Sequence, residues 1–248
     1  MLAALFLCTS SLGASAPGAS CVGSPGLGDP GLRVEHFVLE SPAVESGSDP
    51  VEVGLVCLRR RAIEGVPEGG RQLECEWLFR RPSEPGEDEH VLHVERDAGP
   101  GPALVWREWG ARRSRCLTAE RTPDGSGLLL VETSRGGIPR ETVPAGRDVA
   151  FPLEIVERAR EGKLAKGICA RFEPLARAIE GLAVSTTPGE VRIVELLRED
   201  KSSAGRFEFR GTELVGFTWQ EGGLRARRVT EEEYARRLAA GAPLARRP

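Results

Sequence analysis

Apolar and polar residues alternate along most of this chain, and a period of two is typical of β-strands with one buried face and one solvated face. The clearest example is the segment VEVGLVCL at 51–58, in which every odd position is apolar. The alternation predicts strands over residues 33–40, 51–58, 72–79, 90–97, 114–121 and 127–134, and a further strand that contains Trp106 and Trp109. Residues 135–148 are rich in Gly and Pro, so we expect an irregular loop there.

The C-terminal part of the chain predicts a three-stranded antiparallel meander over residues 206–229, with two Gly-containing turns. This arrangement places Phe207 opposite Phe217, and Phe217 opposite Ala226. One face of the meander is then apolar, and the other carries charged and polar residues. We therefore expect the meander to cover a hydrophobic core with one face.

Helical spacing appears in short segments only, and helices are expected over residues 152–162, 174–181 and 231–241. The first two begin with a Pro and end at a Gly, which suits the first turn and the end of a helix respectively. Thr230 and Glu233 have the spacing of a capping box at the start of the last helix.

These elements predict a mainly β fold of the α+β type. We expect a curved antiparallel sheet or incomplete barrel, with two or three short helices packed on it. Residues 33–248 are interpreted as a single β-rich domain, with candidate halves at 33–165 and 166–240 that follow a similar plan of strands and then a helix.

The N-terminal segment is interpreted as an export signal over residues 1–20, followed by a flexible Pro/Gly/Ser-rich tether over 21–32. The apolar run is far shorter than the ~20 residues of a membrane-spanning helix. No basic residue precedes it. Gly18-Ala19-Ser20-Cys21 resembles a bacterial lipobox, although Gly18 stands where Leu is usual, so Cys21 is a candidate for lipidation. Cleavage after Ala16 is the alternative.

Four further cysteines, Cys57, Cys75, Cys116 and Cys169, form an even set. A hairpin centred on Val66 would place Cys57 directly opposite Cys75, which suits a cross-strand disulfide and leaves Cys116 to pair with Cys169. Disulfides would agree with export. The alternative is four buried free thiols in a protein that stays in the cytosol.

Composition and charge exclude several classes of partner and site. The formal charge is −3, from 34 basic and 37 acidic residues, so no net field favours nucleic acid or an anionic membrane. No nucleotide-binding loop, nucleophile elbow or zinc motif occurs. His90 and His93 would point to opposite faces of a strand. We therefore predict no catalytic residue, no cofactor and no metal site.

The tryptophans are the candidate binding residues. Trp106 and Trp109 are three positions apart on a predicted strand, so their side chains should face opposite ways. One should lie in the core, and the other is exposed, covered by a loop, or lines a cavity. Together with Phe217 and Trp219, they are the residues that we expect to line a ligand cavity if the sheet encloses one.

The run of antiparallel strands from Arg33 to Val229, the interposed helix that begins at Pro152 and the Trp-bearing apolar strand faces resemble the LolA/LolB-like bacterial lipoprotein carriers. The resemblance concerns the plan and no diagnostic motif. It implies an incomplete antiparallel barrel wrapped over short helices, with an apolar concavity. It also implies a non-enzymatic binding or carrier module for a lipid or a lipoprotein acyl chain.

The predicted location is the periplasm, or the outer membrane as a lipoprotein that contacts the membrane only through its N-terminal anchor. Two other functions stay open. The protein could be a structural or interaction module whose sheet face or open strand edge binds another envelope protein. It could also be a hydrolase, if a nucleophile, a His and an acid meet in a cleft.

Overall fold

The computed structural model describes residues 32–42, 49–63, 70–80, 88–98, 101–110, 114–133, 140–146, 148–164, 167–219 and 223–240. These residues belong to one compact unit that begins at Gly31. The predicted signal peptide over 1–20 and the candidate lipidation site Cys21 lie outside the described residues.

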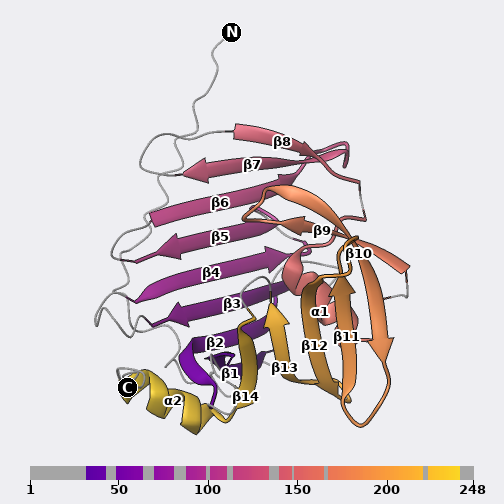
Figure 1. Cartoon of the computed structure of the whole chain (residues 1–248). Helices are drawn as coiled ribbons and strands as arrows, with labels where there is room; N and C mark the ends of the chain where they lie inside the picture. The colour runs from indigo at the N-terminus through magenta and orange to yellow at the C-terminus, as the bar shows by residue number, and fades with distance from the viewer. Residues whose placement is uncertain are drawn as a thin grey trace. The chain divides into compact units, whose positions relative to one another are not determined.

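Fourteen strands of the described residues form a single sheet in which every neighbouring pair is antiparallel. One arm of the sheet comprises β1 (Arg33–Ser41), β2 (Val51–Ala62), β3 (Arg71–Phe79), β4 (Glu89–Arg96), β5 (Leu104–Trp109), β6 (Ser114–Arg121), β7 (Gly127–Thr133) and β8 (Arg140–Pro144). The other arm comprises β9 (Gly167–Glu173), β10 (Ala178–Thr187), β11 (Arg192–Leu197), β12 (Ser203–Arg210), β13 (Glu213–Trp219) and β14 (Arg225–Val229). The arms join where β1 pairs with β14 (Figure 1).

The helix α1 (Pro152–Arg160) lies between the two arms, where it contacts β3 of the first arm and β9 and β12 of the second. The sheet is not closed, and β8 and β9 are its two edges. Ala150, just before α1, bridges to the edge strand β9: its amide donates to the carbonyl of Ala170 over 2.9 Å, and its carbonyl accepts from the amide of Phe172 over 3.0 Å. The connection into α1 therefore covers part of the open edge.

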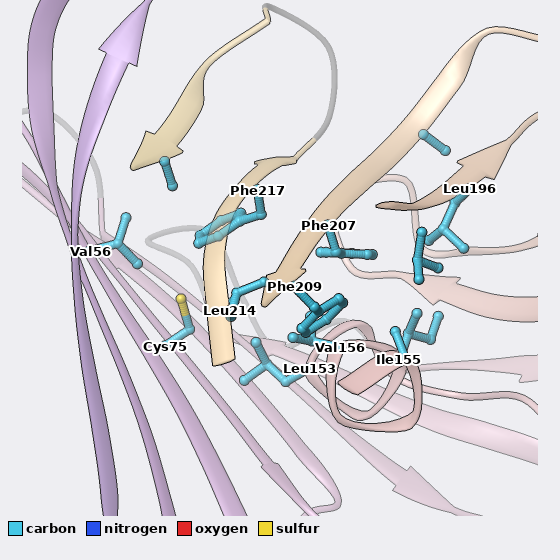
Figure 2. Close-up of a cluster of buried hydrophobic side chains, with 14 of the residues drawn as sticks. Val56, Cys75, Leu153, Ile155, Val156, Leu196, Phe207, Phe209, Leu214 and Phe217 are labelled. Carbon is cyan, nitrogen blue, oxygen red and sulfur yellow. The ribbon is translucent and has the colours of Figure 1, made fainter. Parts of the chain in front are cut away.

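The main hydrophobic core fills the space between the arms. Figure 2 shows this core, with Val56 and Cys75 from the first arm, Phe207 and Phe217 from the second, and Leu153, Ile155 and Val156 from α1. A second cluster, which includes Phe151 and Phe172, lies against β5, β6 and β7. Since alternate residues of each strand point inward, the period of two in the sequence determines the core.

The helix α2 (Glu231–Ala240) packs against β1 on the face of the sheet opposite to α1. Its one buried residue is Tyr234, whose ring lies 4.4 Å from that of His36. The hydroxyl of Thr230 accepts a hydrogen bond from the amide of Glu233 over 3.2 Å, so half of the predicted capping box is present. The Glu233 carboxylate pairs with Arg237 instead.

The prediction of a mainly β fold built on an antiparallel sheet is confirmed, with two helices in the described part of the chain. None of the helices in the described ranges has the length and apolar character to span a membrane.

Two predicted segments are wrong. Residues 140–144, expected to be irregular, form the edge strand β8, which pairs with β7. An edge strand needs partners on one side only and so tolerates Pro. The helix expected over 174–181 is instead a turn followed by β10. Arg177 has a φ of 52°, which ends any helix, and pairing with β9 and β11 overrides the Pro and Gly signals.

The predicted disulfides are absent: in the described part of the chain, no disulfide joins any of the four cysteines. Cys57 pairs with Glu76, and Leu58 pairs with Cys75, so the hairpin register is one residue away from the predicted register. A shift of one residue moves a side chain to the other face of the sheet. Cys75 faces the core around α1, and Cys57 faces away from it. Cys116 and Cys169 lie on different arms.

Candidate binding site

A cavity of about 280 Å³ lies between β3, β4 and β5 of the first arm and the β9–β10 turn and β13 of the second. All four tryptophans of the chain line it. The lining residues are Trp77, Phe79, Glu89, His90, Val91, Trp106, Glu108, Trp109, Leu175, Trp219 and Leu224. We refer to it below as the tryptophan cavity.

The first wall of the cavity follows from strand register. Trp77 on β3 lies opposite Val91 on β4, and Val91 lies opposite Glu108 on β5. Directly opposed residues share a face of the sheet, as do residues two apart on one strand, so Trp106 is on this face as well. The Trp106 indole N–H donates to the Glu108 carboxylate over 2.8 Å, which fixes the orientation of the ring.

The second wall comes from the other arm. Trp219 ends β13 and packs against Phe207, with ring centroids 5.6 Å apart. The guanidinium of Arg171 lies 5.7 Å from the centre of the Trp219 ring. Arg171 is fully buried and is held by the Glu180 carboxylate over 2.6 Å and by the Ala204 carbonyl over 3.2 Å. The Trp219 ring therefore packs against a buried guanidinium group whose charge is paired with a carboxylate.

Below the tryptophan cavity, Trp77, Trp106 and Trp219 also bound a smaller gap of about 20 Å³ that reaches α1. Phe217 lines this deeper gap and packs edge-on against Trp77 at 5.8 Å. The floor of the cavity is thus continuous with the hydrophobic core.

The structure brings together three of the four residues that the sequence singled out. Trp106, Trp109 and Trp219 line the cavity, whereas Phe217 lies just beneath it. Trp109 faces away from Trp106 along β5, stacks on His90 at 5.2 Å, and borders the cavity from the end of the strand.

Sequence reasoning missed Trp77 and Leu175. Trp77 was recognisable as an apolar strand residue, but nothing in the sequence indicated that β3 and β13 line the same space. Leu175 was placed in a predicted helix, whereas it lies in the β9–β10 turn with 44% of its surface exposed.

A buried polar cluster lies next to the gap. The Glu95 carboxylate accepts hydrogen bonds from the amides of Leu153 and Glu154 at the start of α1, both over 2.7 Å. His93 Nε2 lies 2.8 Å from a Glu95 oxygen, and Cys75 is directly opposite His93. A carboxylate in this position satisfies helix amides and complements the helix dipole.

A cysteine, a histidine and an acid in contact raise the question of a nucleophile. Burial, followed by the charges of Glu95 and Glu76, raises the pKa of the Cys75 thiol well above its usual range. The thiol therefore stays protonated at neutral pH, and the thiolate is the reactive form. Because Glu95 already binds two helix amides, the cluster acts as a helix cap. In the described residues, no group of three or more His, Cys, Asp or Glu could hold a metal ion.

Replacing Glu95 with Gln is expected to lower the free energy of unfolding by about 1–3 kcal/mol, because one buried α1 amide would face an NH₂ group in place of an oxygen. Urea denaturation followed by circular dichroism measures the change. Glu120→Gln, at an exposed position on β6, is the matched control and should change stability by about 0.5 kcal/mol or less. Equal losses in both variants would contradict the capping role.

No family model matches this chain, and no curated protein is significantly similar to it. Among solved structures, it is similar to a beta-barrel-like protein of the domain of unknown function DUF1849 from Brucella abortus. The TM-score is 0.41 and the sequence identity is 10%, over 80% of this chain and 96% of that chain.

Proposed function

We propose that this protein is a non-enzymatic binding or carrier module for an apolar ligand, such as a lipid or an acyl chain. The observation that supports the proposal is the presence of all four tryptophans around one cavity. Large aromatic side chains normally bury their surface inside a domain, yet here each indole is only partly buried.

The energetics favour an apolar occupant. Each aromatic side chain can bury about 150–250 Å², and covering apolar surface yields roughly 25 cal/mol per Å². The rings sit on strands and are fixed by contacts such as the Trp106–Glu108 hydrogen bond, so little side-chain freedom is lost on binding. The cavity volume is near the lower end of small-molecule sites, which are about 300–1,000 Å³.

We also propose that the protein acts in the bacterial envelope, as the resemblance to lipoprotein carriers implies. This part of the proposal rests on the apolar segment within residues 1–20 and on Cys21 as a candidate lipid anchor. It does not rest on disulfides, because none joins the four cysteines among the described residues.

Binding of another envelope protein is a second candidate function, supported by the edge strand β9. Ile168 on this strand is 85% exposed, and a strand edge can pair with a strand of a partner. Ile168→Lys should abolish such pairing and leave ligand binding in the tryptophan cavity intact.

The test is a titration of the purified protein with the apolar dye N-phenyl-1-naphthylamine, with intrinsic tryptophan fluorescence as the readout. Saturable quenching is expected, since every indole of the chain lines the site. Trp106→Ala should weaken binding roughly tenfold or more, as truncation of a buried aromatic anchor does. Val105→Ala, the neighbouring residue on β5 with its side chain on the other face, should bind as the parent does. Absence of saturable binding, or equal affinities of both variants, would contradict the proposal.

A further inference from the structure

Among the described residues, the ionisable side chains that line the tryptophan cavity are acidic, apart from His90. Glu89 and Glu108 line it, and no Lys or Arg of the described residues does, although the chain contains 34 basic residues. A cavity for an anionic amphiphile such as a fatty acid would need the opposite arrangement, because carboxylates repel a carboxylate ligand.

The carboxylates of Glu89 and Glu108 line the cavity together with its aromatic rings. Glu89 lies opposite Phe79 on the neighbouring strand, and Glu108 lies opposite Val91 and bonds to the Trp106 indole. A carboxylate has acceptor sites for several hydrogen bonds, so the Glu108 bond to Trp106 leaves capacity for a ligand donor. Negative charge and indole rings thus share one face of the sheet.

Indole rings attract cations through the negative potential of their faces, and Trp does so more strongly than Tyr or Phe. The protein already uses this attraction: Arg107 lies 5.5 Å from the centre of the Trp109 ring, and Arg171 lies 5.7 Å from that of Trp219. Trp77 and Trp106 pack instead against the rings of Phe79 and His93, respectively. The charge of Arg171 is met by Glu180 and Glu173, so it does not add a net positive field at the cavity.

We propose that the ligand of the tryptophan cavity is a cationic amphiphile, with an amine or quaternary ammonium head beside Glu108 and an apolar tail against the tryptophan rings. This inference rests on the proposed function and specifies its ligand class. The aromatic rings supply affinity for both parts of such a molecule, and the carboxylates select the sign of its charge.

The experiment compares three probes with the same alkyl chain: decyltrimethylammonium, decanol and decanoate. Each displaces N-phenyl-1-naphthylamine from the purified protein at low ionic strength, below the concentration at which the probes form micelles. The ammonium probe should bind roughly tenfold more tightly than decanoate, the range that a cation–π contact and a nearby carboxylate supply. Added salt should reduce this preference, because ions screen partly exposed charges.

Glu108→Gln separates charge from geometry, since the amide oxygen of Gln can still accept the Trp106 hydrogen bond. In this variant the preference for the ammonium probe over decanoate should fall severalfold, whereas Glu120→Gln, on the exposed part of β6, should retain it. Decanoate binding as tightly as the ammonium probe, or an unchanged preference in Glu108→Gln, would overturn the inference while leaving apolar binding in place. If none of the three probes bound, the proposed function itself would fail.

Discussion

Replacing Glu35 with Leu is expected to lower the free energy of unfolding by about 3–5 kcal/mol, the cost of removing one partner from a buried ion pair. Arg160, at the end of α1, is 4% exposed and binds both oxygens of Glu35, over 3.0 and 2.6 Å. Arg228 binds the same carboxylate over 2.9 Å. Without Glu35, two guanidinium groups would lose their shared counter-ion.

The pKa of Arg160 is consistent with this network. Burial by itself lowers this pKa, but the hydrogen bonds and charges of Glu35 and Glu157 outweigh burial and raise it. Because the network joins α1 to both β1 and β14, it fixes the helix at the point where the two arms meet.

Urea denaturation of three variants tests the prediction. Arg160→Met should cost less than Glu35→Leu, because Glu35 keeps Arg228 and Glu157 keeps Arg60 at 3.1 Å. Arg225→Met, which removes an exposed ion pair with Glu208, should cost about 1 kcal/mol or less. The reverse order, with Arg225→Met the most damaging, would show that the buried network does not stabilise the fold.

Truncation of Phe207 to Ala is the second change with a large expected effect, about 3–5 kcal/mol, because it removes buried apolar surface and leaves a cavity in the core. Phe207 is completely buried, lies opposite Phe217 and packs against Trp219. The same change should weaken dye binding, since Trp219 would lose the ring that supports it.

Chemical denaturation and dye titration measure these two effects in one variant. Leu129→Ala on β7 serves as the control, because Leu129 points away from the core that contains Leu128 and Leu130. This control should lose about 1 kcal/mol or less, with unchanged dye affinity. A Phe207→Ala protein as stable as the control would mean that the meander contributes little to the core.

The strands could be predicted from sequence because a period of two is a local property. The facing pairs Phe207–Phe217 and Phe217–Ala226 were predicted correctly, since short turns fix the register between neighbouring strands. The longer connection between β2 and β3 does not fix it. There the prediction was off by one residue, so Cys57 and Cys75 do not lie directly opposite each other as predicted.

The cavity could be predicted only in part. We selected Trp106, Trp109 and Trp219 as candidate binding residues because large aromatic side chains on strands are expected to lie in the core or to line a cavity. Their convergence depends on the two arms facing each other, which is a long-range property of the sheet. Arg171 could not have been found, because its burial depends on Glu180 and on a carbonyl of β12. Among so many arginines, no local pattern marks it.

The pairing of β1 with β14 also has a consequence for how the chain folds. These are the first and last strands of the sheet in sequence, and they are neighbours at its centre. Each arm is a succession of local hairpins, but the two can be joined only after the final strand has been synthesised. Such non-local pairing slows folding. A chain that completes its sheet only with its last strand cannot reach the full sheet while it is still being synthesised.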